Sequence, residues 1–132
     1  MLSNKLIKGG SETMKNIILI LVALSLFLFS ATVFAGEGPL ALPSGANSEA
    51  KKHNIEGIDH WQQGHYDVAL KHFSAASAAD ASSGEIHFNE AISYDKVGKH
   101  GDATKHFGVA LKKAGGNPQI LNSPILKGHL GM

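Results

Sequence analysis

The sequence predicts an all-α fold in which antiparallel helix–turn–helix pairs stack into a short solenoid. Three observations lead to this prediction. Residues 50–83 align without gaps on residues 84–117, apolar side chains recur at three- and four-residue spacing in both units, and a glycine divides each unit in two. Each 34-residue unit is therefore expected to form one helix pair that stacks on its neighbour.

The two units share nine identities in 34 positions, where about two would follow from ordinary composition. These are His53/His87, Glu56/Glu90, Ile58/Ile92, Gly64/Gly98, Ala69/Ala103, Lys71/Lys105, His72/His106, Phe73/Phe107 and Ala76/Ala110. The alanines allow two helices to approach closely, and the phenylalanines fill the space between them. The predicted helices span 49–63, 66–79, 85–97 and 102–114, with both shared glycines at helix reversals.

This pattern resembles the tetratricopeptide repeat, a 34-residue helix pair with an A-x3-F motif in its second helix. Here the motif is supplied by Ala69 and Phe73, and again by Ala103 and Phe107. The sequence departs from the family pattern because no Trp opens either unit, Glu replaces Leu twice, and Pro is missing at both unit ends. The resemblance covers residues 49–117, as repeats 50–83 and 84–117, and implies a concave groove that binds a protein or peptide.

The resemblance also implies which residues line that groove. They come from the first helix of each pair: Lys51, Asn54, Ile58, Trp61, Gln62, Glu85, Phe88, Asn89, Ile92, Asp95 and Lys96. Aromatic anchors among hydrogen-bonding groups suit an extended or helical peptide. We expect Trp61 and Phe88 to be these anchors, and the alternative is that Trp61 packs against the next repeat.

Residues 1–35 are predicted to be an N-terminal extension followed by a secretory signal peptide. A short positive leader at Lys15 precedes the apolar run 17–29, and small residues stand near Ala35. We predict that Met14 is the true start and that cleavage near Ala35 makes the protein periplasmic or secreted. The membrane is a partner only if this segment stays uncleaved as an anchor.

The segments on either side of the repeats have different compositions. Residues 36–48 are rich in Gly, Pro and Ser, and are predicted to be a flexible linker. Residues 118–132 are predicted to be a C-terminal capping helix and tail, because Pro118 suits a first helical turn and apolar residues follow it. Because two repeats and a cap make a short stack, a homo-oligomer is an open alternative to the monomer.

The composition of the chain excludes several classes of function. Beyond residue 35 the chain carries nine lysines, ten acidic residues and no arginine, so it offers no basic field for nucleic acid. The absence of cysteine excludes disulfides, thiol nucleophiles and zinc–thiolate sites. No phosphate-binding loop, nucleophile elbow or H-E-x-x-H motif occurs. We therefore predict a protein-binding scaffold that is not an enzyme and has no cofactor.

The eight histidines suggest an alternative function, a histidine-rich periplasmic metal-binding protein. His53, Glu56 and His60 share one helix face, His87 repeats His53, and such donors suit zinc, copper or nickel. However, a spacing of seven residues separates His53 from His60 by about 10.5 Å along the helix. Repetition at equivalent positions is also typical of scaffold packing. We therefore predict no metal site and keep these four residues as candidates only.

Overall fold

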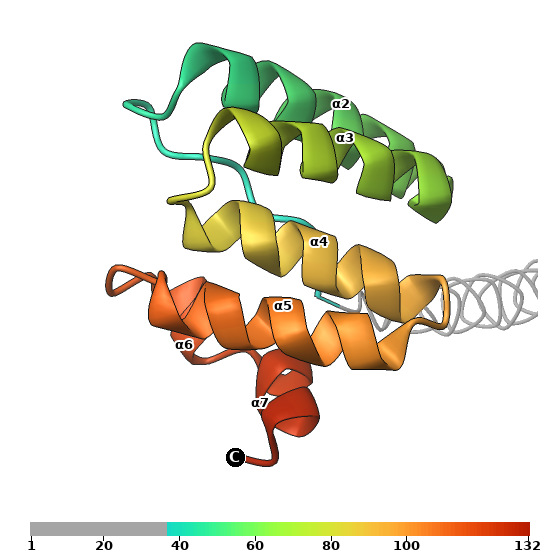
Figure 1. Ribbon diagram of the computed structural model, residues 1–132, viewed down its shortest axis with the longest axis vertical. Helices are drawn as coiled ribbons and strands as arrows, with labels where there is room; N and C mark the ends of the chain where they lie inside the picture. Colours follow the sequence, from blue (N-terminus) through green and yellow to red (C-terminus); the bar gives the residue numbers. More distant parts are fainter. Residues whose placement is uncertain (1–36) are drawn as a thin grey trace, which may run out of the picture. The chain divides into compact units, whose positions relative to one another are not determined.

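The computed structural model describes residues 37–132, and this range contains helices and no strand. The helices are α2 (Ser48–Gln62), α3 (Tyr66–Ala79), α4 (Gly84–Lys96), α5 (His100–Lys112), α6 (Pro118–Leu121) and α7 (Pro124–Leu130). Helices α2 and α3 form one antiparallel pair, α4 and α5 form the next, and α3 packs on α4 (Figure 1). The predicted all-α fold of stacked helix pairs is confirmed. The predicted start, signal peptide and cleavage site lie outside the described residues.

Both helix pairs reverse at the glycines that the sequence indicated. Gly64 and Gly98 each have a φ of 78°, in the left-handed region that side chains other than glycine rarely adopt. In both turns the next amide bonds back to the preceding helix, from His65 N to His60 O and from Lys99 N to Tyr94 O, each over 2.9 Å. The same turn chemistry therefore closes both pairs.

Alanine and phenylalanine fill the space between the paired helices. The repeated alanines and phenylalanines of α3 and α5 have no exposed surface: Ala69, Phe73, Ala76, Ala103, Phe107 and Ala110. Gly57 of α2 lies so close to Phe73 that an added Cβ would stand 2.5 Å from its ring. The first pair is therefore packed so closely at this position that an added methyl group would displace the Phe73 ring.

Helices α6 and α7 pack on the second helix pair: α7 contacts α5, and α6 contacts both α4 and α5. Ile120 and Leu126 are fully buried and belong to the same core cluster as Phe107. Each short helix begins with proline in its first turn, and the side chains of Asn117 and Ser123 cap them by accepting backbone hydrogen bonds. The C-terminal segment is thus two short helices that close the core.

Residues 37–46, named the N-terminal strap below, do not form the flexible linker that their composition predicted. Leu40 is 8 % exposed and belongs to the main core cluster. Glu37 fixes the start of the strap, because its Oε2 accepts hydrogen bonds from Ser123 Oγ (2.9 Å) and Ile125 N (2.8 Å). The strap is the turquoise segment that passes behind α4 in Figure 1. Tertiary contacts therefore override the local tendency of Gly and Pro to form a flexible chain.

Candidate functional site

Two buried asparagines, one from each helix pair, hold the backbone of the strap. Asn89 accepts a hydrogen bond from Leu40 N at Oδ1 (2.6 Å) and donates from Nδ2 to Leu40 O (2.8 Å). Asn54 Nδ2 donates to the same carbonyl (3.0 Å), and its Oδ1 accepts from Asn89 Nδ2 (2.8 Å). Asn54 is 1 % exposed and Asn89 is 0 % exposed. They therefore recognise an extended main chain and also align each other.

The Leu40 side chain occupies an apolar position between α4 and the C-terminal helices. It lies in one cluster with Phe88, whose ring meets Phe107 edge-on with centroids 5.6 Å apart. A hollow of about 470 Å³ beside it is lined by Glu37, Gly38, Pro39, Leu40, Phe88, Pro118, Gln119 and Asn122. A second hollow of about 510 Å³ lies near Pro43 and Gly84. The surface therefore offers free space next to an extended segment that is already bound.

Four of the predicted groove residues contact the strap. Asn54 and Asn89 bind its backbone, Phe88 packs with Leu40, and Lys51 Nζ donates to Ser44 O (3.2 Å). These contacts come from α2 and α4, the helices that the resemblance assigned to the groove. The face that was expected to receive a separate peptide is occupied by the chain's own N-terminal strap.

The two expected aromatic anchors lie in different surroundings. The half-buried Trp61 ring meets Tyr66 edge-on at 4.7 Å between centroids, and it packs against the core cluster of the second helix pair. Phe88 is only 1 % exposed, so it is not an accessible anchor while the strap is bound. Trp61 therefore takes the alternative role, in which it packs against the next repeat.

The other predicted groove positions do not form one surface. Ile92 is buried in the core, Ile58 is half-buried, and Gln62 and Lys96 are exposed. Glu85 accepts a hydrogen bond from Asn117 Nδ2 (2.8 Å), which ties α4 to the segment before α6. The part of the predicted groove that holds a chain segment is thus the middle of α2 and α4.

The metal candidates His53 and Glu56 do converge, but with His72 of α3 in place of His60. The Nδ1 atoms of His53 and His72 lie 3.2 and 3.1 Å from Glu56 Oε2. The His60 ring stacks on His72 with centroids 5.2 Å apart. We name His53, Glu56 and His72 the first-repeat cluster, and its members are all half-buried.

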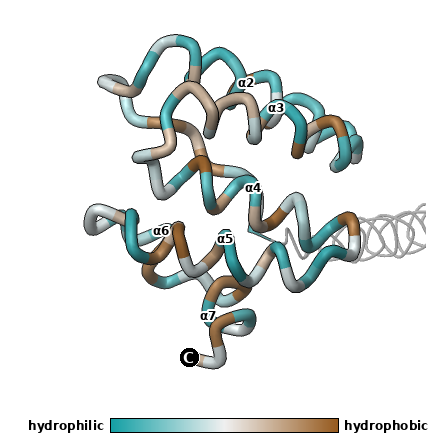
Figure 2. The backbone as a smooth tube through the Cα atoms, viewed as in Figure 1, coloured by the Kyte–Doolittle hydropathy of each residue, from teal (hydrophilic) through white to brown (hydrophobic). Residues whose placement is uncertain are grey.

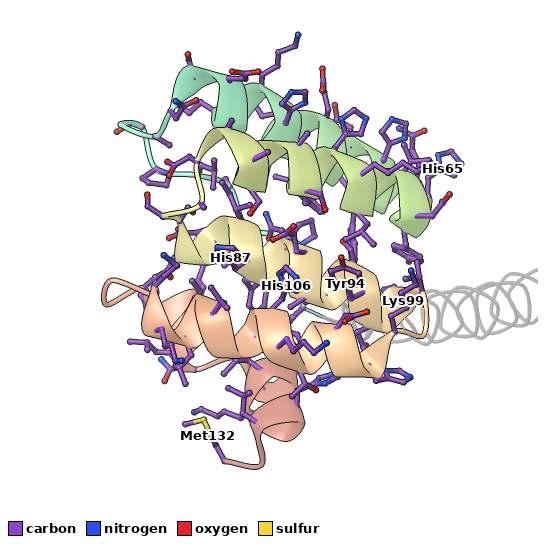
Figure 3. All side chains as sticks on the ribbon, viewed as in Figure 1. His65, His87, Tyr94, Lys99, His106 and Met132 are labelled. Atoms are coloured by element: carbon purple, nitrogen blue, oxygen red, sulfur yellow. The ribbon has the colours of Figure 1, made fainter. Side chains whose placement is uncertain are left out.

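The fourth candidate, His87, lies in the equivalent place of the second repeat. His87, Glu90 and His106 form the second-repeat cluster, in which both Nδ1 atoms lie 3.1 Å from Glu90 Oε2. The side chains of the three residues are 11 %, 5 % and 28 % exposed. Ser74 Oγ of α3 donates to the other carboxylate oxygen of Glu90 (3.1 Å). Figure 3 labels the two histidines, which come from α4 and α5.

The second-repeat cluster keeps a buried carboxylate charged. Burial raises the pKa of Glu90, but the neighbouring rings of His106 and His87 and the hydrogen bond from Ser74 Oγ outweigh it and lower the pKa to about 2. The hydrogen bond to Glu90 raises the pKa of His87; burial opposes this shift, and the Ala81 carbonyl supports it. Glu90 is therefore held in its charged form by the two rings and the serine hydroxyl that surround its carboxylate.

The sequence contains a signal for both clusters. His53, Glu56 and His72 recur 34 residues later as His87, Glu90 and His106, a recurrence that scaffold packing also explains. In the structure each repeat brings its own three groups together, because the first and second helices of a pair lie side by side. The residue spacing within one helix cannot identify a ligand that comes from the second helix of the pair, as His72 and His106 do.

A third group of titratable residues connects α4, α5 and α7. Asp95 Oδ1 lies 2.8 Å from His100 Nδ1 and 3.0 Å from His129 Nε2. The other ring nitrogen of His129 lies 3.0 Å from Thr104 Oγ1. Since both nitrogens of His129 have protein partners, this group holds the C-terminal helix against the second pair.

Comparison with known proteins identifies no family. No protein-family model matches the chain, and no curated protein matches it. Within residues 37–132, no helix has both the length and the apolar character needed to cross a membrane.

Proposed function

We propose that the protein is an exported scaffold, similar to tetratricopeptide repeat proteins, that binds an extended protein or peptide segment on the face formed by α2 and α4. One observation carries the proposal: Asn54 and Asn89 together hold both the N–H and the C=O of Leu40. The predicted signal peptide supports a periplasmic or secreted location. The proposed role is binding without catalysis.

The chemistry of this face favours an extended segment with an aliphatic residue at its centre. Hydrogen bonds to the main chain provide affinity for any sequence, and pockets for individual side chains provide specificity. Here the two asparagines contact the main chain, while the position beside Phe88 accepts the Leu40 side chain. A partner segment in extended conformation with Leu or a similar residue fits both requirements.

The strap competes with any such partner. It is part of the same chain, so its effective concentration at the face is high, on the order of millimolar for a short connection. A partner must displace Leu40 and the two asparagine contacts before it can bind. The strap therefore excludes weak ligands and limits binding to segments that use the surface better than the strap does.

A substitution that releases the strap allows peptide binding to the exposed face to be measured. Leu40→Asp places a charge in an apolar position, which we expect to release the strap. The probe is a fluorescent peptide with the strap sequence EGPLALPSGA, and its binding is measured by anisotropy. We expect at least tenfold tighter binding to Leu40→Asp than to the wild type. Ala41→Asp is the matched control, because Ala41 is exposed in the same strap and its variant should behave as wild type.

A second substitution identifies the binding face. Adding Asn89→Ala to Leu40→Asp removes the hydrogen bonds to the peptide backbone and should weaken peptide binding by about tenfold or more. Circular dichroism confirms that each variant is helical. If folded Leu40→Asp binds the peptide no better than the wild type, or if Asn89→Ala leaves its binding unchanged, the proposed function is wrong.

A further inference from the structure

Each repeat brings three metal-ligand atoms to one point. In both clusters, two imidazole nitrogens and one carboxylate oxygen all lie within 4.8 Å of one another. A zinc ion with bonds of about 2.0–2.2 Å to nitrogen and oxygen places neighbouring tetrahedral ligands about 3.4 Å apart. The nitrogen–oxygen distances of 3.1–3.2 Å in the clusters are close to that separation. Small side-chain movements would therefore admit an ion.

The hydrogen bonds of His87 require a proton or a metal ion between its Nδ1 atom and Glu90. His87 Nε2 lies 3.0 Å from Ala81 O, and a carbonyl can only accept, so Nε2 carries the proton. In a neutral ring Nδ1 is then a lone pair, and it faces Glu90 Oε2 at 3.1 Å. Two acceptors at this distance repel each other unless a proton or a metal ion lies between them.

His106 brings a second nitrogen to the same carboxylate oxygen. Its Nδ1 lies 3.1 Å from Glu90 Oε2 but outside hydrogen-bond geometry, and it is buried without a hydrogen-bond partner among residues 37–132. A buried nitrogen without a partner is costly in a protein that binds nothing at this point. Coordination to an ion shared with His87 and Glu90 would satisfy it.

Outer contacts orient the ligands as they do in metal sites. The Ala81 carbonyl fixes the tautomer of His87, and Ser74 Oγ holds Glu90 Oε1, which leaves Oε2 directed at the two rings. The Tyr94 ring lies against His106 with centroids 5.0 Å apart. These neighbours hold the second-repeat cluster in one geometry before any ion arrives.

We propose that His87, Glu90 and His106 bind a divalent transition-metal ion of the zinc class, and that the first-repeat cluster is an equivalent, weaker site. Two imidazoles and one carboxylate suit zinc and its neighbours, whereas magnesium and calcium prefer oxygen ligands alone. The first-repeat cluster is weaker because Glu56 is 38 % exposed and, within the described chain, has no serine corresponding to Ser74. This site is separate from the strap site and does not depend on it.

Zinc titration of the full protein tests the proposal. After treatment with a chelator and its removal, calorimetry at neutral pH with Zn²⁺ alone should show saturable binding, and Mg²⁺ should show none. His106→Ala should abolish the tightest binding event, and Ser74→Ala should weaken it by about 10- to 100-fold. His65→Ala is the matched control, because His65 is exposed and lies outside the clusters.

Thermal unfolding separates metal binding from a packing role. Zn²⁺ should raise the melting temperature of the wild type and of His65→Ala, but should raise it less in His106→Ala. Because His106 is partly exposed, that variant should remain folded, and circular dichroism in chelator checks this. Absence of saturable Zn²⁺ binding at neutral pH, or equal binding by folded His106→Ala, would overturn the proposal and assign the cluster to proton-linked packing.

Discussion

At the scale of single residues, the charge of Glu90 has a measurable consequence for stability in the metal-free protein. Its pKa falls from 4.5 to about 2 on folding, so its contribution is complete above pH 4.5 and is lost as the pH falls toward 2. The shift corresponds to roughly 3 kcal/mol at most. The pKa of His87 is raised above 6.5, so its contribution is complete below pH 6.5 and is lost at higher pH. We therefore expect the free energy of unfolding to be largest between about pH 4.5 and 6.5.

Urea unfolding in chelator at several pH values measures this dependence. Glu90→Gln removes the charge but keeps the shape, so the decrease in stability between pH 4.5 and 2 should become smaller than in wild type. Glu49→Gln is a suitable control, because Glu49 is exposed at the start of α2 and should leave the pH profile unchanged. An acid limb that is equally steep in Glu90→Gln would contradict the prediction.

Residues also show where sequence reasoning stops. The family pattern selected Asn54 and Asn89 as groove residues, and the structure places both on one bound backbone. The sequence could not identify Leu40 as their partner, because nothing local in a Gly- and Pro-rich segment records a contact made 49 residues away. The clusters were missed for a related reason, since His72 and His106 reach their carboxylates from a different helix.

At the scale of helices, the start of α4 depends on a glycine that no turn requires. A Cβ added to Gly84 would lie 2.6 Å from the backbone oxygen of Lys113, and a backbone atom cannot move away as a side chain can. We expect Gly84→Ala to lower the free energy of unfolding by about 1–3 kcal/mol, because α4 and the end of α5 must separate. Urea or thermal unfolding measures this change.

Gly108 provides the opposite case within α5. An added Cβ there meets nothing within 4 Å, so Gly108→Ala should stabilise the protein by about 0.5–1 kcal/mol through helix propensity. The two variants introduce the same methyl group, and only its surroundings differ. A stabilising effect of Gly84→Ala would show that α4 and α5 do not approach this closely.

The strap and α7 stabilise each other through Glu37. Its carboxylate accepts a hydrogen bond from the backbone N–H of Ile125, which has no partner within the first turn of α7, as a capping residue would. Glu37→Ala should cost about 0.5–2 kcal/mol and should increase amide hydrogen exchange in α7 more than in α2 and α3. If exchange rises equally in all helices, or in none, the strap does not anchor this cap.

The helices were easier to predict than the strap for a physical reason. The predicted 66–79 coincides with α3, and the other long helices differ from their predicted ranges by one or two residues at each end. Helix periodicity and the glycine turns are local properties, so the sequence records them directly. The strap has no periodicity, and its structure comes entirely from the helices that it crosses.

At the scale of the whole described unit, the two ends of the helix stack have different surfaces. Most residues of α2 are hydrophilic (Figure 2), and among its exposed residues only Ile55 is hydrophobic, at 53 % exposure. At the other end α6 and α7 cover α5, and they bury Ile120 and Leu126 completely. Because one end of the described stack is polar and the other is capped, neither end presents an apolar surface that would pair with another copy.

We therefore expect a monomer in solution, although a two-repeat stack alone left self-association open. Light scattering coupled to size exclusion should give the mass of one chain across a wide range of concentration. Leu126→Glu should disrupt the cap and expose the cluster around Phe107, which would produce association that grows with concentration. Leu121→Glu changes a neighbouring residue that is already 40 % exposed, so this control should remain monomeric. A wild-type dimer that Leu121→Glu dissociates would show instead that the cap is an interface between copies, because only a buried contact at that surface would respond to the new charge.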